Sequence, residues 1–110
     1  MKPGEIDFDN LSFSFTRTRS MYVAKCKLWS EWGAGKIIPF ENLNISPAAG
    51  VLNYGQGLFE GMKAYKWDDG RIAMFRPEMN AKRAANGCIR LSMPEIPGSL
   101  FLDAVKKVVW

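Results

Sequence analysis

The sequence has 110 residues, enough for one domain with a single hydrophobic core, and its 47% hydrophobic and 24% charged residues are typical of globular proteins. It contains no histidine and two distant cysteines, Cys26 and Cys88, which excludes a metal centre and histidine-dependent catalysis within these residues. The net charge of +4 is dispersed, and no apolar run approaches the roughly 20 residues that cross a bilayer, so neither a nucleic-acid nor a membrane partner is expected.

The first part of the chain, residues 1–12, is expected to be a flexible N-terminal segment because it combines Pro3-Gly4 with several acids. Residues 13–110 are expected to form one domain. The N-terminus lacks the apolar core of a signal peptide and the Arg/Ser-rich, acid-poor bias of a transit peptide. A cytoplasmic location is therefore expected, or a mature form whose presequence is absent.

Extended structure is predicted for residues 13–28, where β-favouring side chains are frequent and apolar residues alternate with lysines near the end. The polar residues 17–20 are a candidate bend that would divide this segment into a hairpin. A short strand is predicted at 36–40, and Pro39 indicates that it lies at a sheet edge. Next, Ser46-Pro47 predicts the N-cap and first residue of a short helix.

The second half of the sequence has clearer signals. Two strands, 62–67 and 72–75, are predicted to form a hairpin around Asp69-Gly70. A helix is predicted to start at Pro77 with a buried stripe at helical spacing, and Gly87 indicates close packing within it. A second helix is predicted from Ser99, and the chain stops while this pattern continues, which suggests a truncation. The expected stripes are Ala81, Ala84, Ala85 and Cys88 in the first helix, and Phe101, Ala104, Val105 and Val108 in the second.

Two motifs carry a family resemblance: Tyr54-x-x-x-x-Phe59-Glu-Gly, and Phe75-Arg-Pro-Glu-x-Asn-x-x-Arg83. In order and spacing they resemble the N-terminal part of branched-chain amino acid aminotransferases, and the resemblance covers about residues 13–109. It implies an α+β fold, the small N-terminal domain of a fold type IV pyridoxal-phosphate enzyme, with a largely antiparallel sheet and two to three helices. It also implies the cofactor pyridoxal 5'-phosphate, amino-group transfer from Leu, Ile or Val to 2-oxoglutarate, and a homodimer for the full-length enzyme.

The resemblance also implies the roles of four residues. Arg83 would bind the cofactor phosphate, for which the guanidinium fork is well shaped. Tyr54, Phe59 and, by a weaker local similarity, Phe13 would line the pocket for the apolar side chain of the substrate, because branched aliphatic groups are selected by shaped apolar cavities. The alternatives are a surface arginine at Arg83 and ordinary core packing of the three aromatic rings.

No catalytic residue is expected within this chain, because in the family the lysine that holds the cofactor lies far downstream. Lys63 is close to the first motif but is not that lysine, and strand alternation favours a surface position. The chain alone is therefore expected to be inactive. Two other hypotheses remain: a truncated partner of a full-length aminotransferase subunit, and a binding module for single-stranded nucleic acid that uses a basic, aromatic β-surface within residues 13–28.

Overall fold

The computed structural model describes residues 5–110. Residues 1–4, part of the segment expected to be flexible, lie outside the described residues. The rest of that segment contains a short 3-10 helix, η1 (Phe8–Asn10). The carboxylate of Asp7 caps it by accepting a hydrogen bond from the amide of Asp9.

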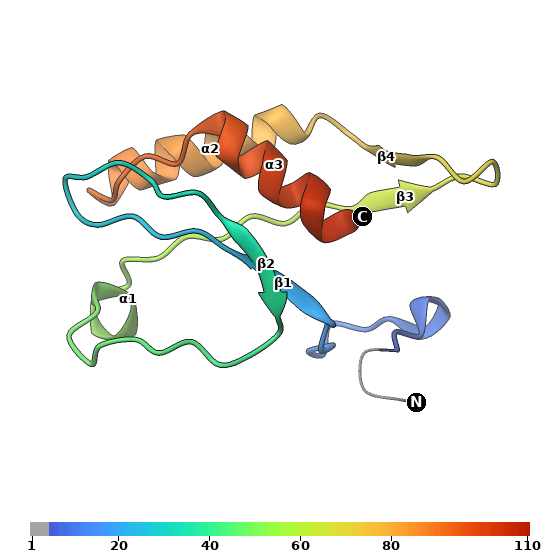
Figure 1. Cartoon of the computed structure of the whole chain (residues 1–110), viewed down its shortest axis with the longest axis horizontal. Helices are drawn as coiled ribbons and strands as arrows, with labels where there is room; N and C mark the ends of the chain where they lie inside the picture. The colour runs from blue at the N-terminus through green and yellow to red at the C-terminus, as the bar shows by residue number, and fades with distance from the viewer. Residues whose placement is uncertain (1–4) are drawn as a thin grey trace.

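The molecule combines helices with two separate two-stranded antiparallel sheets, which confirms the predicted α+β class (Figure 1). Helices α2 and α3 lie side by side, the β1–β2 sheet crosses below them, and the β3–β4 hairpin extends from the start of α2. No helix in the described part of the chain is long and apolar enough to cross a membrane. In chain order the elements are β1 (Ser20–Val23), β2 (Lys36–Pro39), α1 (Gly50–Asn53), β3 (Ala64–Lys66), β4 (Ile72–Met74), α2 (Pro77–Arg90) and α3 (Gly98–Val109).

The strand predicted over 13–28 is wrong in its extent, because only β1 forms and it pairs with β2 rather than within a local hairpin. Residues 13–18 belong to no strand of the described chain, and Arg19 adds one backbone hydrogen bond to the pairing, from the amide of Phe40 to its carbonyl at 3.1 Å. Arg17 instead packs over the ring of Phe40 at 5.4 Å and donates a hydrogen bond to the Phe40 carbonyl at 3.0 Å. The prediction for β2 is confirmed, including the edge position of Pro39, since both strands of a two-stranded sheet are edges.

The short helix predicted at Ser46-Pro47 is also wrong. The hydroxyl of Ser46 accepts a hydrogen bond from the Ala48 amide at 3.1 Å, and its carbonyl accepts from Ala49 at 3.0 Å, so these residues form a single turn that does not continue. Helix α1 starts three residues later than predicted, at Gly50, with Ala49 as its N-cap. Ser46 thus supplies the local bonds of a turn, a role that serine takes as readily as capping.

The β3–β4 hairpin and the start of α2 are confirmed. Gly70 has φ +85°, a left-handed conformation that favours glycine at this turn. Three of the four residues predicted to be buried on α2 are buried, and Ala85 is half-buried. On α3 no residue is buried: Phe101, Ala104 and Val105 of the predicted stripe are half-buried, whereas Val108 is exposed and the prediction fails there.

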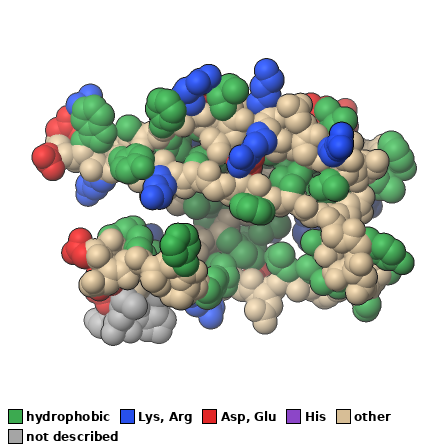
Figure 2. Space-filling view, turned by 180° about the vertical axis from the view of Figure 1, so that it is seen from behind, with side chains coloured by type: hydrophobic (Ala, Val, Ile, Leu, Met, Phe, Trp, Pro, Cys, Tyr) green, Lys and Arg blue, Asp and Glu red, His purple; other side chains and the backbone are tan. Residues whose placement is uncertain are grey.

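The core of the described chain is very small: only Ala81, Ala84 and Cys88 are buried. The accessible surface is 9433 Å², whereas a compact monomer of this mass has about 6,100 Å². The radius of gyration, 15.6 Å, also exceeds the value of about 13 Å for a compact domain of this length. Hydrophobic side chains are therefore spread over the surface (Figure 2).

Candidate functional site

The two motifs meet because residues 56–61 run antiparallel along α2. At one end, the side-chain amide of Gln56 donates to the carbonyl of Leu91 at 2.9 Å. One turn earlier on the helix, Leu58 packs over Gly87, where an added Cβ would lie 3.2 Å from Leu58 Cδ2. The absence of a side chain at Gly87 thus permits the close approach that the sequence predicted.

The same alignment continues for two more turns and brings Glu60 and Gly61 to Arg83 and Asn80. The contacts on the helix side extend from residue 91 to residue 80, which is about 16 Å along an α-helix. The six residues from 56 to 61 are joined by five residue-to-residue steps, which cover that length only when nearly fully extended. Alternate side chains of an extended segment face opposite ways, so Leu58 and Glu60 face α2 and Phe59 faces away.

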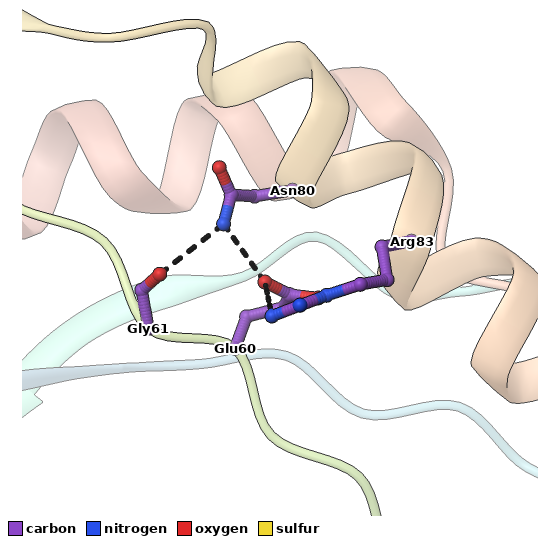
Figure 3. A network of polar contacts seen from close by, with 4 residues as sticks. All are labelled: Glu60, Gly61, Asn80 and Arg83. Carbon is purple, nitrogen blue, oxygen red and sulfur yellow. Dashed lines mark hydrogen bonds and ion pairs between the residues drawn. The ribbon is translucent and has the colours of Figure 1, made fainter.

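At the centre of this contact is an ion pair between Glu60 and Arg83 (Figure 3). Arg83 Nε donates to Glu60 Oε1 at 2.5 Å, and Arg83 Nη2 donates to Oε2 at 2.8 Å. Asn80 Nδ2 donates to the same Oε2 at 2.8 Å and to the carbonyl of Gly61 at 3.2 Å. Helix α2 therefore binds both the carboxylate of Glu60 and the backbone carbonyl of Gly61 through hydrogen bonds.

The two partners of this ion pair differ in their environments. The side chain of Glu60 is 8% exposed, whereas that of Arg83 is 70% exposed. Hydrogen bonds from Arg83 and then from Asn80 stabilise the carboxylate and lower the pKa of Glu60 below its ordinary value. In return, the hydrogen bond and charge of Glu60 raise the pKa of Arg83. Both groups are thus charged at neutral pH, and Arg83 is an ordered arginine held by a carboxylate rather than an unattached surface side chain.

Glu60 was missed by the sequence analysis, although it lies inside the first motif. The sequence pattern that could have indicated it is an acid, Glu60, in the first motif together with Asn80 and Arg83, which are three residues apart on the helix of the second motif. Residues at i and i+3 on a helix are neighbours, so Asn80 and Arg83 can share one acceptor. Lys63 is exposed, as the strand alternation predicted, although it lies just before β3 rather than within it.

The aromatic residues predicted to bind substrate are not core residues of this chain. Tyr54 is 87% exposed and Phe59 is 88% exposed, so neither ring packs in the core of the described residues. Phe59 borders a shallow hollow together with Val51, Gly55 and Gly57.

The backbone around this hollow depends on glycine. Gly55 has φ +63°, and a Cβ added at Gly57 would lie 2.9 Å from Val51 Cγ2. Both positions therefore favour a residue without a side chain.

Phe13 is not brought to the other two aromatic residues. It is fully exposed, and within residues 5–110 its ring contacts neither Tyr54 nor Phe59. The basic, aromatic β-surface considered for nucleic-acid binding is not formed either. Phe13 and Phe15 precede β1 in a segment without strand structure, and Lys25 and Lys27 follow it.

Comparison with known proteins relates the chain to aminotransferases over nearly its whole length. It is 51% identical over 105 residues to a chloroplastic branched-chain-amino-acid aminotransferase of Arabidopsis thaliana, covering 96% of this chain and 25% of that protein. The identity is 50% over 105 residues to a chloroplastic branched-chain amino acid aminotransferase of Humulus lupulus, covering 96% and 26%. A methionine aminotransferase of A. thaliana is 47% identical over 107 residues, covering 97% and 30%. No protein-family model matches the chain.

Most of these relatives are aminotransferases of branched-chain amino acids. The resemblance carried by the two motifs is therefore confirmed. The chain spans about a quarter of the length of the curated relatives that it matches. This coverage fits a portion of such an enzyme.

Proposed function

We propose that this chain is part of a pyridoxal-phosphate-dependent aminotransferase that acts on branched-chain amino acids and the corresponding 2-oxo acids. The observation that carries the proposal is the meeting of the two motifs, in which Glu60, the residue next to the exposed Phe59, holds the guanidinium of Arg83. The cofactor, when bound, supplies the electron sink for chemistry at the α-carbon of the amino acid.

The residues present fit the phosphate of this cofactor. A guanidinium has five N–H donors, of which the hydrogen bonds to Glu60 use two. The remaining donors of Arg83 are on Nη1 and Nη2, and the side chain is largely exposed. An arginine that is fixed in orientation but open at one edge is suited to bidentate phosphate binding.

The exposed rings fit the substrate. Tyr54 and Phe59 would supply apolar walls against which an aliphatic side chain packs, and Phe13, which is not brought to them within this chain, would add a third wall in the complete protein. Because one relative is a methionine aminotransferase, we propose a pocket for apolar side chains of similar size rather than for leucine alone. Relatives that are chloroplastic or mitochondrial favour the second of the two expected locations, a mature organellar form.

The decisive experiment replaces Arg83 in the full-length protein that carries this segment. Arg83→Ala should weaken cofactor binding by roughly ten- to a hundredfold, the usual effect of losing charge-assisted hydrogen bonds. Arg83→Lys should recover only part of it, because an ammonium lacks the fork. Arg90→Ala is the matched control, since Arg90 is exposed on the same helix and has no ion pair among residues 5–110. The measurement is cofactor titration by absorbance, and equal affinity for wild type and Arg83→Ala would refute the assignment.

The aromatic residues have a separate test. Tyr54→Ala and Phe59→Ala should reduce the preference for leucine and valine over alanine and leave the cofactor affinity largely unchanged. Steady-state kinetics with the three amino acids measures this preference. An unchanged ratio in both variants would remove the two rings from the substrate pocket.

A further inference from the structure

We propose that Glu60 is a positioning residue of the phosphate site: it holds one edge of the Arg83 guanidinium while phosphate binds the other edge at the same time. The proposal rests on the proposed function of Arg83. It adds a largely covered carboxylate that stays in place when the anion binds, and it assigns the two edges of one guanidinium to two different acceptors.

The first argument is the geometry of the ion pair. A guanidinium is planar and has two edges that can form paired hydrogen bonds, one made by Nε and one Nη, the other by the two Nη atoms. Glu60 occupies the first edge, through Nε and Nη2. The second edge is left with hydrogens on Nη1 and Nη2, on a side chain that is 70% exposed. An anion can therefore approach without competing for the donors that Glu60 uses.

The second argument is the rigidity of the acceptor. The carboxylate of Glu60 is fixed by Asn80, and the same amide holds the carbonyl of the next residue, Gly61 (Figure 3). Leu58 anchors the segment one turn away, against Gly87. A guanidinium bound to such an acceptor loses most of its rotational freedom before the anion arrives, and this loss is then not incurred on binding.

The third argument is the cost of the alternative, in which phosphate displaces Glu60. Displacement would leave a carboxylate that is 8% exposed without its cation and with Asn80 as its side-chain donor, and a largely covered charge without a counter-charge is unfavourable. While the ion pair is intact, Arg83 and Asn80 lower the pKa of Glu60, so the group that phosphate would have to displace is a charged carboxylate at neutral pH. Simultaneous binding of Glu60 and phosphate to Arg83 is therefore favoured over displacement of Glu60 by phosphate.

The direct test follows the Arg83 side-chain resonances by NMR in the full-length protein labelled with [15N]arginine. Inorganic phosphate and pyridoxal 5'-phosphate are the two probes. Sharing predicts that the Nη signals respond to both probes while the Nε–H signal keeps its hydrogen-bonded position. An Nε–H signal that moves with binding would overturn the proposal and leave the proposed function intact. If no Arg83 signal responds, the proposed function fails as well.

A variant separates positioning from charge. Glu60→Asp keeps the negative charge but shortens the reach, so it should release the Nε–H signal and weaken cofactor binding about tenfold, as is usual when a supporting partner is removed. The matched control is Glu78→Asp, the same change at an exposed acid of α2 whose nearest cation, Arg76, is 3.9 Å away. Unchanged or tighter binding in Glu60→Asp would overturn the proposal. Should that variant fail to fold, the wild-type titration decides alone.

Discussion

The packing between the β1–β2 sheet and α3 depends on one glycine, Gly35, which precedes β2. A Cβ added there would overlap three atoms of the Tyr22 side chain, Cε1, Cζ and Oη. The ring cannot shift freely, because it belongs to β1 and its hydroxyl donates to Asp103 on α3 at 3.3 Å. Gly35→Ala should therefore push the Tyr22 ring away from α3 and break this hydrogen bond.

The expected destabilisation follows from two opposing effects. Overpacking of this kind costs about 1–3 kcal/mol. Replacing glycine by alanine also restricts the unfolded chain, which offsets about 0.4–1 kcal/mol. Gly35→Ala should thus lower the free energy of unfolding by roughly 1–2 kcal/mol. Gly98→Ala is the control: Gly98 begins α3, an added Cβ meets nothing within 4 Å, and the variant should be unchanged or slightly more stable.

The measurement is urea unfolding followed by circular dichroism, with a double-mutant cycle that includes Tyr22→Ala. Without the ring, Gly35→Ala has nothing to overlap and should cost little. The reasoning would be refuted if Gly35→Ala were equally destabilising with and without the Tyr22 ring.

Further predictions concern the site, a turn and the chain as a whole. Because the folded-state pKa of Glu60 is lowered by Arg83 and Asn80, its contribution to stability is present above the unfolded-state pKa and lost as pH falls through the folded-state value. Unfolding measured across that acid range should be less pH-dependent in Glu60→Gln, and parallel curves would contradict this. Gly70→Ala should cost about 1–2 kcal/mol in thermal or urea unfolding, because alanine is strained at φ +85°, and no loss would argue against the turn. The 110-residue chain alone should show no transamination of leucine with 2-oxoglutarate and added pyridoxal phosphate, whereas turnover comparable to a complete enzyme would place a reactive lysine within it. The exposed apolar side chains should make the isolated chain self-associate in sedimentation, and a strictly monomeric chain at high concentration would count against that expectation.

Sequence reasoning succeeded where the structure is decided by neighbouring residues. The turn at Asp69-Gly70 and the start of α2 at Pro77 have local causes, a left-handed glycine and a proline at a first helical position, and both were predicted. The strand predicted over 13–28 failed for the opposite reason. A strand needs a partner, and the partner, β2, covers only four residues of it.

The candidate site was predicted in part for the same reason. The motifs drew attention to Arg83, Tyr54 and Phe59, but the low exposure of the Glu60 side chain arises only when residues 56–61 lie against α2. A charged side chain is ordinarily expected at the surface, so composition and periodicity gave no reason to bury this one. The exposure of Phe59 beside it is likewise a consequence of that alignment.

The antiparallel alignment of residues 56–61 with α2 also restricts which insertions and deletions the chain tolerates. Every second residue meets a successive helical turn, so one inserted residue would exchange the faces of Phe59 and Glu60, turning the aromatic ring towards Arg83 and the acid towards solvent. A deletion within residues 56–61 would leave a segment too short to contact both residue 91 and residue 80. The exposed turn at 68–71 lies between the same two motifs without such a constraint. Length changes between the motifs should therefore be accepted at the hairpin tip and rejected next to the helix.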